Sequence, residues 1–117
     1  MHGLPVAQEI VNTVIRSVKE RQGKVRRIQV EMGPDSTIDA QELELCFEIA
    51  SQGTPIEGST LNVSLAPGNV TCLDCGKTEL RTVVERIPTC QACLGTNLRI
   101  EEKGFAIKNI SFEEASG

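Results

Sequence analysis

The sequence contains no tryptophan and no tyrosine, and its three phenylalanines bring the aromatic content to only 3%. A hydrophobic core must therefore rest on Val, Ile and Leu. No apolar run approaches the ~20 residues that a membrane-spanning helix needs. The N-terminus also lacks the basic segment followed by an apolar segment that marks a secretory signal. These absences predict a cytoplasmic protein that makes no contact with a membrane.

Composition and charge place the chain among globular proteins. Its 117 residues are 39% hydrophobic and 24% charged, which suits one modest domain, or one domain plus a small second one. The net charge is −4, and this argues against bulk nucleic-acid binding, which needs a net basic surface. Residues 16–27 contain six basic side chains and one acid, whereas residues 28–70 contain seven acids and neither Lys nor Arg. This asymmetry indicates either a solvated face, with cations near a helix C-terminus, or a bipolar surface that docks charged partners.

The first part of the chain reads as two helices and two strands. Apolar residues recur at helical spacing from Val6 to Val18, and Gly23 acts as a stop signal. The segment from residue 25 to residue 32 alternates as a half-buried strand does, and a second strand is expected over residues 60–65. A second helix is expected to begin after Asp39, the N-cap, with Glu42 completing a capping box. The side chains expected to be buried by this helix and the second strand are Leu43, Cys46, Phe47, Ala50, Leu61, Val63 and Leu65.

A cysteine-bearing segment interrupts this pattern before a final strand. The segment is too short to build an apolar core unaided, and the strand-like residues 104–114 slip in alternation between Ile107 and Ile110, as at a bulge. We therefore predict an α+β fold: a small three-stranded sheet with two helices, plus an inserted β-rich module resembling a zinc ribbon. The first domain would span residues 1–68, completed by the strand 104–114, and the cysteine domain would span residues 69–103.

Four of the five cysteines form two CxxC pairs, which fourteen residues separate. This spacing is typical of a structural zinc site in which four thiolates surround the metal in a tetrahedron. The predicted ligands are Cys72, Cys75, Cys90 and Cys93. Gly76 and Gly95 lie close behind the pairs, where the chain needs a positive φ angle. A redox pair or a disulfide is the alternative, but a redox CxxC normally lies at a helix N-terminus and cytosolic disulfides are uncommon. Cys46 lies on the apolar stripe of the second helix and is interpreted as a core residue.

The single histidine is the second residue of the chain. A chain that begins Met1-His2 offers an α-amine, an amide nitrogen and an imidazole within chelating distance of one another. Ni(II) and Cu(II) accept such a planar, nitrogen-rich donor set, whereas Zn(II) and Mg(II) have other preferences. On this evidence alone, His2 is either a bystander at the chain end or a metal ligand.

The order of these features resembles the HypA/HybF family of hydrogenase-maturation nickel metallochaperones. The resemblance rests on "MH" at the start, the two helices and strands, "GTPIEG", and the CxxC…CxxC module. It implies a cytosolic protein with a nickel domain and a zinc domain, which carries Ni(II) as transient cargo and holds Zn(II) as a structural ion. The implied partners are a maturation GTPase and the precursor of the hydrogenase large subunit, and some members also serve urease and its accessory proteins.

Carried over by position, the resemblance implies that Met1, His2 and Gly3 bind nickel and that Asp39 lies near that site. The chain departs from the family at Gly3, where Glu is common, and at Pro34, which also stands where Glu is common. A rival interpretation is a zinc-ribbon adaptor that binds proteins or nucleic acid. An enzyme fits poorly, because the expected zinc site has no open position and no nucleophile motif is present.

Overall fold

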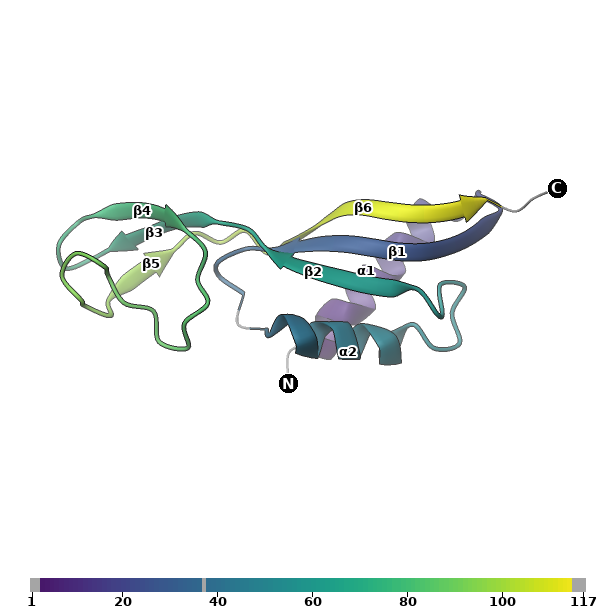
Figure 1. Cartoon of the computed structure of the whole chain (residues 1–117), viewed down its shortest axis with the longest axis horizontal. Helices are drawn as coiled ribbons and strands as arrows, with labels where there is room; N and C mark the ends of the chain where they lie inside the picture. The colour runs from purple at the N-terminus through teal and green to yellow at the C-terminus, as the bar shows by residue number, and fades with distance from the viewer. Residues whose placement is uncertain (1–2, 37, 115–117) are drawn as a thin grey trace. The chain divides into compact units, whose positions relative to one another are not determined.

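The computed structural model describes residues 3–36 and 38–114, and these residues form two compact units (Figure 1). Of the described residues, 3–30, 38–64 and 106–114 make up the first unit. The second unit contains residues 31–36 and 65–105. Each unit has its own three-stranded sheet. The α+β fold with an inserted β-rich module is therefore confirmed.

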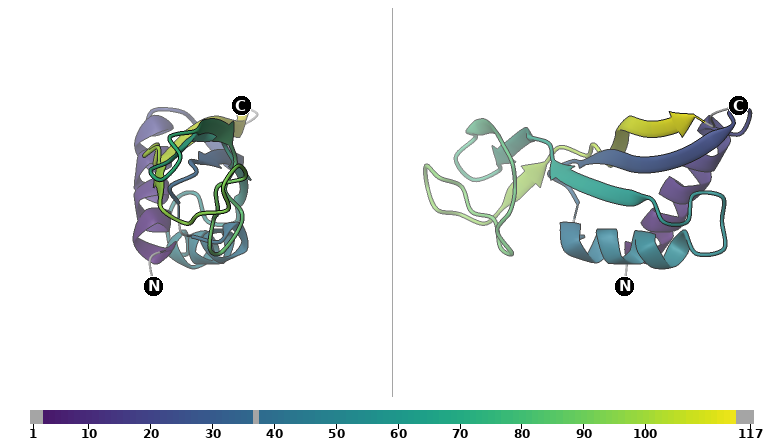
Figure 2. Two further views of the ribbon diagram at one scale, coloured as in Figure 1. Left: turned by 90° about the vertical axis from the view of Figure 1, so that its left-hand side faces the viewer. Right: turned by 45° about the vertical axis from the view of Figure 1, so that its right-hand side comes forward.

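Two helices supply much of the core of the first unit. Helix α1 (Gly3–Ser17) and helix α2 (Ala40–Ala50) pack against each other, and together they cover one face of the sheet (Figures 1 and 2). The apolar stripe of α1 is buried as its 3.6-residue period predicts. On α2, Leu43, Cys46 and Phe47 are buried as expected, so Cys46 is a core residue, whereas Ala50 is only half-buried.

The sheet of the first unit consists of β1 (Gly23–Met32), β2 (Thr60–Leu65) and β6 (Phe105–Glu114), in the order β2-β1-β6. Its central strand carries four buried side chains: Val25, Ile28, Val30 and Met32. The last strand is half-buried at Ile107 and again at Ile110, so its alternation changes parity where the sequence slips. The expectation for β2 was correct for Leu61 but wrong for Val63, which is half-buried, and for Leu65. Leu65 ends the strand with 39% of its surface exposed, because it is the last residue of an edge strand.

The capping interaction expected at the start of α2 does not form. Asp39 occupies the N-cap position with an extended backbone (φ −67°, ψ 138°), but its side chain makes no capping hydrogen bond. The backbone alone begins the helix, since the Leu43 N–H donates to the Asp39 carbonyl at 2.9 Å. The Asp39 carboxylate therefore has no role in capping.

The second unit is a small antiparallel sheet with little apolar core. Strands β3 (Gly68–Cys72), β4 (Thr78–Arg81) and β5 (Leu98–Ile100) are ordered β4-β3-β5, with Val70 opposite both Glu79 and Ile100. Its large apolar side chains are mostly exposed; these are Leu73, Leu80, Val84, Ile87 and Leu94. So few buried apolar groups cannot offset the entropy of ordering some forty residues. A further cross-link must stabilise this unit.

A turn after β1 is tied to the segment that precedes β6, within the second unit. The Gly33 N–H donates to the Gly104 carbonyl at 2.8 Å, and Asp35 Oδ1 accepts from the Lys103 and Gly104 N–H groups at 3.0 and 3.3 Å. Pro34, which has no N–H to donate, is buried in this turn.

Across residues 3–36 and 38–114, no helix has the length and apolar character needed to cross a membrane.

Candidate metal centre

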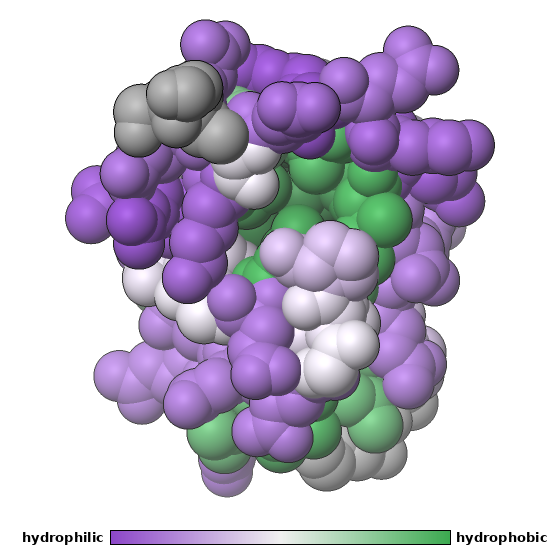
Figure 3. Space-filling model, turned by 90° about the vertical axis from the view of Figure 1, so that its right-hand side faces the viewer, coloured by the Kyte–Doolittle hydropathy of each residue, from purple (hydrophilic) through white to green (hydrophobic). Residues whose placement is uncertain are grey.

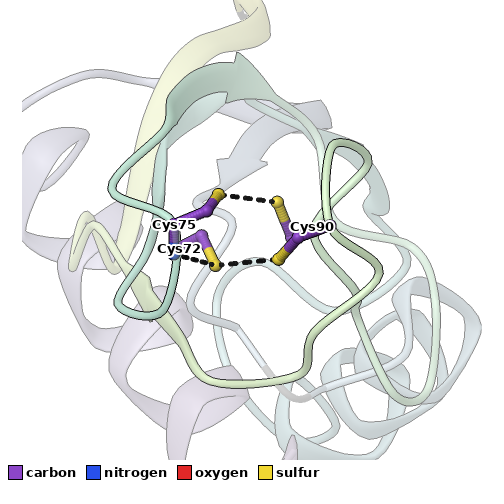
Figure 4. A group of neighbouring side chains, drawn as sticks. Cys72, Cys75 and Cys90 are labelled. Atoms are coloured by element: carbon purple, nitrogen blue, oxygen red, sulfur yellow. Dashed lines mark hydrogen bonds between the residues drawn. The ribbon is translucent and has the colours of Figure 1, made fainter.

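Two turns of the second unit bring four cysteine sulfurs together. Cys72 is the last residue of β3 and Cys75 lies in the turn that follows, whereas Cys90 and Cys93 flank a second turn. The four Sγ atoms all lie within 4.8 Å of one another. The sulfurs point toward a common centre between the two turns (Figure 4). The structure therefore assembles the cluster that the CxxC spacing predicts.

The two turns are built by the same hydrogen bonds. In the first turn, the Gly76 N–H donates to the Cys72 carbonyl at 2.9 Å, and the Cys72 N–H donates to the Lys77 carbonyl at 2.8 Å. In the second turn, the Leu94 N–H donates to the Cys90 carbonyl at 2.8 Å, and the Cys90 N–H donates to the Gly95 carbonyl at 2.7 Å. Each turn is a closed loop of six residues that fixes both of its sulfurs. The site is thus preformed by the backbone.

The residue after each CxxC pair adopts the left-handed conformation. Gly76 has φ +80°, as expected, but in the second turn the equivalent residue is Leu94, with φ +64°. Gly95 does not have a positive φ, so the expectation for this glycine was wrong. It is needed for space instead, because a Cβ at Gly95 would lie 3.1 Å from Asp74 Oδ2 and 3.3 Å from Cys93 Sγ.

Backbone N–H groups stabilise negative charge on the first sulfur of each turn. The Cys75 N–H lies 3.4 Å from Cys72 Sγ, and the Ala92 N–H lies 3.4 Å from Cys90 Sγ. Hydrogen bonds from the Cys93 and Ala92 N–H groups lower the pKa of Cys90 to about 7. Cys90 is therefore the sulfur that most readily becomes a thiolate before a cation arrives.

The thiols of Cys75 and Cys93 hold their protons more tightly than usual without a metal. A backbone hydrogen bond from Gly95 favours the Cys93 thiolate, but sharing a proton with Cys72, together with burial, raises the pKa of Cys93 to about 12. At Cys75, a backbone hydrogen bond from Lys77 lowers the thiol pKa. Hydrogen bonds that Cys75 shares with Cys72 and Cys90 outweigh this effect, so the pKa of Cys75 is raised as well. Four crowded sulfurs cannot all be anionic without a cation between them. The cluster has the electrostatics of a metal centre.

A tetrahedron of sulfurs is a closed donor set. Soft thiolates favour Zn(II) and similar ions, and four protein ligands leave no position for water or substrate. Close sulfur separations run between the two turns, at 3.5 Å for Cys72–Cys93 and 3.7 Å for Cys75–Cys90, and all of these cysteines are free thiols. Neither pair begins a helix, which is where a redox CxxC gains its reactivity. The geometry favours a structural metal site over a redox pair.

The residues predicted to bind nickel fall partly outside the described structure. Met1 and His2 lie outside the described residues, so the structure says nothing of their placement. Gly3 begins α1 and is buried against α2, where a Cβ added to it would lie 3.1 Å from Cys46 Sγ and 3.6 Å from Glu42 Cδ. Sequence reasoning assigned Glu42 only to the capping box. Its position next to the start of the chain follows from the packing of the two helices, for which the sequence carries no local signal.

Comparison with known proteins decides the family. A family model described as "Hydrogenase/urease nickel incorporation, metallochaperone, hypA" matches residues 1–112. The chain belongs to the HypA family. The match includes both the Met1-His2-Gly3 start and all four clustered cysteines, and the family is one of nickel metallochaperones that serve hydrogenase and urease.

Named relatives of the HypA family span nearly the whole chain. The hydrogenase maturation factor HypA of Rippkaea orientalis is 34% identical over 115 residues, which cover 97% of each chain. That of Trichodesmium erythraeum is 32% identical over 117 residues, with 99% of each chain covered. Among solved structures, the solution structure of the nickel metallochaperone HypA from Helicobacter pylori matches with a TM-score of 0.64 at 18% identity, over 98% of this chain and 100% of that chain. This last likeness confirms the fold of this HypA-family chain.

Proposed function

We propose that this protein carries Ni(II) for the maturation of [NiFe]-hydrogenase, and that it holds a structural Zn(II) in its cysteine cluster. The observation that supports the proposal most directly is the family match, which begins at residue 1 and includes the chelating start of the chain. The α-amine of Met1, the imidazole and amide of His2, and the amide of Gly3 would form the nickel site. The nickel would be cargo, bound and released in the cytoplasm.

The chemistry of the two donor sets separates the two metals. Nitrogen donors in a plane suit Ni(II), whereas four thiolates in a tetrahedron suit Zn(II). Cys72, Cys75, Cys90 and Cys93 would hold the zinc, and the ion would take the place of the apolar core that the second unit lacks. The protein would therefore use one metal for folding and a different metal for its task.

The environment of Gly3 adds a carboxylate to the proposed nickel site. The half-buried Glu42 side chain lies beside Gly3, since its Cγ and Cδ are 3.5 and 3.6 Å from where a Cβ on residue 3 would stand. A carboxylate at this position lowers the free energy of a cation bound by the preceding residues. Glu42 would thus replace the acidic residue that relatives commonly carry at position 3, and Asp39, which makes no capping hydrogen bond, stands one turn earlier.

Release of such cargo requires a receiver. The family description names both hydrogenase and urease, and the named relatives are hydrogenase maturation factors. We propose the hydrogenase large-subunit precursor as the client and a maturation GTPase as the partner that assists the transfer. A chelate at a chain end opens by fraying, without unfolding a domain, which suits repeated loading and release.

Metal analysis of untagged protein tests the proposal. Wild-type protein should contain one zinc and take up one Ni(II), and His2→Ala should retain the zinc and lose nickel uptake. Cys90→Ser should do the reverse, losing zinc while the nickel donors remain. Glu42→Gln should weaken nickel binding with the zinc content unchanged, and Gln41→Glu, an exposed change on the same helix, should not weaken it.

The pH dependence of nickel uptake provides an independent check on the ligands. The proposed donors include an α-amine and an imidazole, whose reference pKa values are about 7.7–8.0 and about 6.5. Nickel competes with protons for both, so affinity should fall as the pH is lowered from about 8 to about 6. A flat titration over this range, or full nickel uptake by His2→Ala, would show that the cargo is bound elsewhere.

A further inference from the structure

A cavity of about 230 Å³ opens in the first unit where α1 ends and β1 begins. Its walls are largely apolar, formed by Ile15, Val18, Val25, Pro55, Ile56 and Phe112. Figure 3 looks onto this end of the chain and shows hydrophobic residues gathered in a hollow that hydrophilic residues surround. The cavity is built from residues of the first unit, and none of the proposed metal ligands lines it.

Two cations stand at the rim of the cavity. Lys19 and Arg21 both line it, and both are exposed. Arg21 is held in place, because its Cζ lies 4.2 Å from the centroid of the Phe112 ring and its Nη2 lies 3.3 Å from Glu114 Oε1. An apolar hollow with a cationic rim is the result.

The size of the cavity limits what it can hold. Sites for small-molecule ligands typically measure about 300–1,000 Å³, whereas an apolar cavity of about 150 Å³ already accepts a benzene molecule. This cavity therefore suits a single large apolar side chain. A cofactor or metabolite of ordinary size would not be enclosed.

The charge around the cavity determines which residues can flank the inserted side chain in the partner. The chain carries six basic residues and a single acid between residues 16 and 27, although the protein as a whole is acidic. A cationic rim on an acidic protein attracts anionic partners and repels cationic ones. Two acids near the rim are engaged, since Glu114 Oε1 lies 3.3 Å from Arg21 Nη2 and Glu57 Oε1 accepts a hydrogen bond from the Gly53 N–H at 2.7 Å.

We propose that this cavity is a docking site for an acidic segment of a partner protein, which inserts one large apolar side chain between α1 and Phe112. The apolar anchor supplies most of the affinity, and Lys19 and Arg21 select the acidic flanks. This inference does not depend on the nickel or zinc proposals, since it uses neither set of ligands. It gives the basic residues that follow α1 a role in recognition.

The test uses the full-length protein as purified and fluorescein-labelled peptides with blocked ends. The first probe is a Phe flanked on each side by three acidic residues. The second probe replaces the Phe by Gly, and the third replaces the acids by Lys. Fluorescence anisotropy should show saturable binding of the first probe, binding weaker by about tenfold or more for the Gly probe, and none for the Lys probe. Raising the salt from 50 to 500 mM should weaken binding of the first probe.

Matched variants locate the binding surface. Lys19→Glu reverses a rim charge and should weaken binding of the first probe by about threefold or more. Arg86→Glu makes the same charge change at an exposed site of the second unit and should leave binding unchanged. In the wild-type protein, the NMR signals of amides around Phe112 should shift when the first probe is added. This measurement needs no variant, so it locates the site even if Lys19→Glu folds poorly.

Several results would overturn the proposal. Absence of binding at millimolar peptide, equal affinity for the Phe and Gly probes, or an equal effect of Lys19→Glu and Arg86→Glu would each exclude an anchored acidic segment. Vesicles containing phosphatidylglycerol serve as a competing ligand. If the protein bound these vesicles and not the acidic peptide, the surface would be a lipid site.

Discussion

Gly3 packs so closely against Cys46 that a Cβ on residue 3 would lie 3.1 Å from the Cys46 sulfur. The contact joins the first turn of α1 to the buried face of α2, where Cys46 is only 2% exposed. A side chain at position 3 would have to displace a core sulfur or the Glu42 side chain beside it. The packing of these two helices thus leaves room for a glycine at position 3.

Replacing Gly3 by Glu should therefore destabilise this protein, even though Glu is the residue that the family resemblance leads us to expect at position 3. Overpacking against Cys46 costs about 1–3 kcal/mol, and the added carboxylate would stand beside Glu42. Chemical denaturation followed by far-UV circular dichroism measures the loss. Gln8→Glu adds the same charge at an exposed position of α1 and should change stability by less than about 0.5 kcal/mol. Equal stabilities for the two variants would mean that the contact between α1 and α2 can rearrange around a larger side chain with no loss in the free energy of unfolding.

Leu94 stores backbone strain in the cysteine cluster. It holds φ +64° with its side chain 75% exposed, at the position that Gly76 occupies in the other turn. Since a left-handed residue other than Gly costs about 1–2 kcal/mol, Leu94→Gly should stabilise the metal-loaded second unit by roughly 1 kcal/mol. The measurement is zinc retention in a competition titration with a chelator.

Leu73 supplies the control for this prediction. It is also exposed and also directly follows a clustered cysteine, in this case Cys72, but its φ is not positive. Leu73→Gly therefore removes a similar side chain without relieving strain and should weaken zinc retention slightly. If both variants changed retention in the same direction, side-chain loss and not backbone conformation would be responsible.

The sequence predicts the elements and the cysteine cluster because the signals are local. Helical periodicity in α1 and alternation in β1 each depend on burial of one face, and the CxxC spacing reflects a turn of fixed size. The prediction for Gly95 was wrong because a turn with a positive φ can carry that conformation at Leu94 instead. A sequence shows that such a turn needs a left-handed residue, but not which of two neighbours adopts it.

Features that depend on two distant segments were not predictable. The placement of Glu42 beside Gly3 and the cavity between α1, the loop at Pro55 and β6 both arise from tertiary packing. The capping box at Asp39 failed for a related reason, since the backbone started the helix without help from the side chain. Local patterns specify which groups are available, and packing decides which of them are used.

The pair between Arg26 and Glu113 should make stability depend on pH at the acid end. The Arg26 guanidinium donates to the Glu113 carboxylate and holds the pKa of Glu113 below its usual range, while the pKa of Arg26 is raised. The folded state thus favours the ionised carboxylate. Its stabilisation is complete above the unfolded pKa of about 4.3 and is lost as the pH falls through the lower folded value.

Glu113→Gln should accordingly lower the thermal midpoint slightly at pH 7, and the difference from wild type should vanish near pH 3. The effect is small because both side chains are exposed. Glu102→Gln removes an exposed carboxylate of the second unit and is the matched control. Thermal melts at both pH values test the sign. A difference that grew toward acid pH would contradict the direction of the pKa shift.

Loss of one clustered cysteine should unfold the second unit and leave the first unit intact. The first unit has a core of Val, Ile and Leu side chains with Phe47 at its centre, whereas the second unit exposes most of its large apolar residues. Metal binding to such a site contributes about 10–16 kcal/mol in small zinc modules, so Cys90→Ser should remove most of the stability of residues 65–105.

Hydrogen exchange should then show protected amides in α1, α2 and β1 and rapid exchange in β3, β4 and β5. Cys46→Ser provides the converse, because a hydroxyl in the apolar contact between the helices should cost the first unit about 1–3 kcal/mol while zinc content stays at one per chain. Persistent protection of β3 in Cys90→Ser would mean that hydrogen bonds and the few buried side chains suffice, and that the metal is dispensable for this fold.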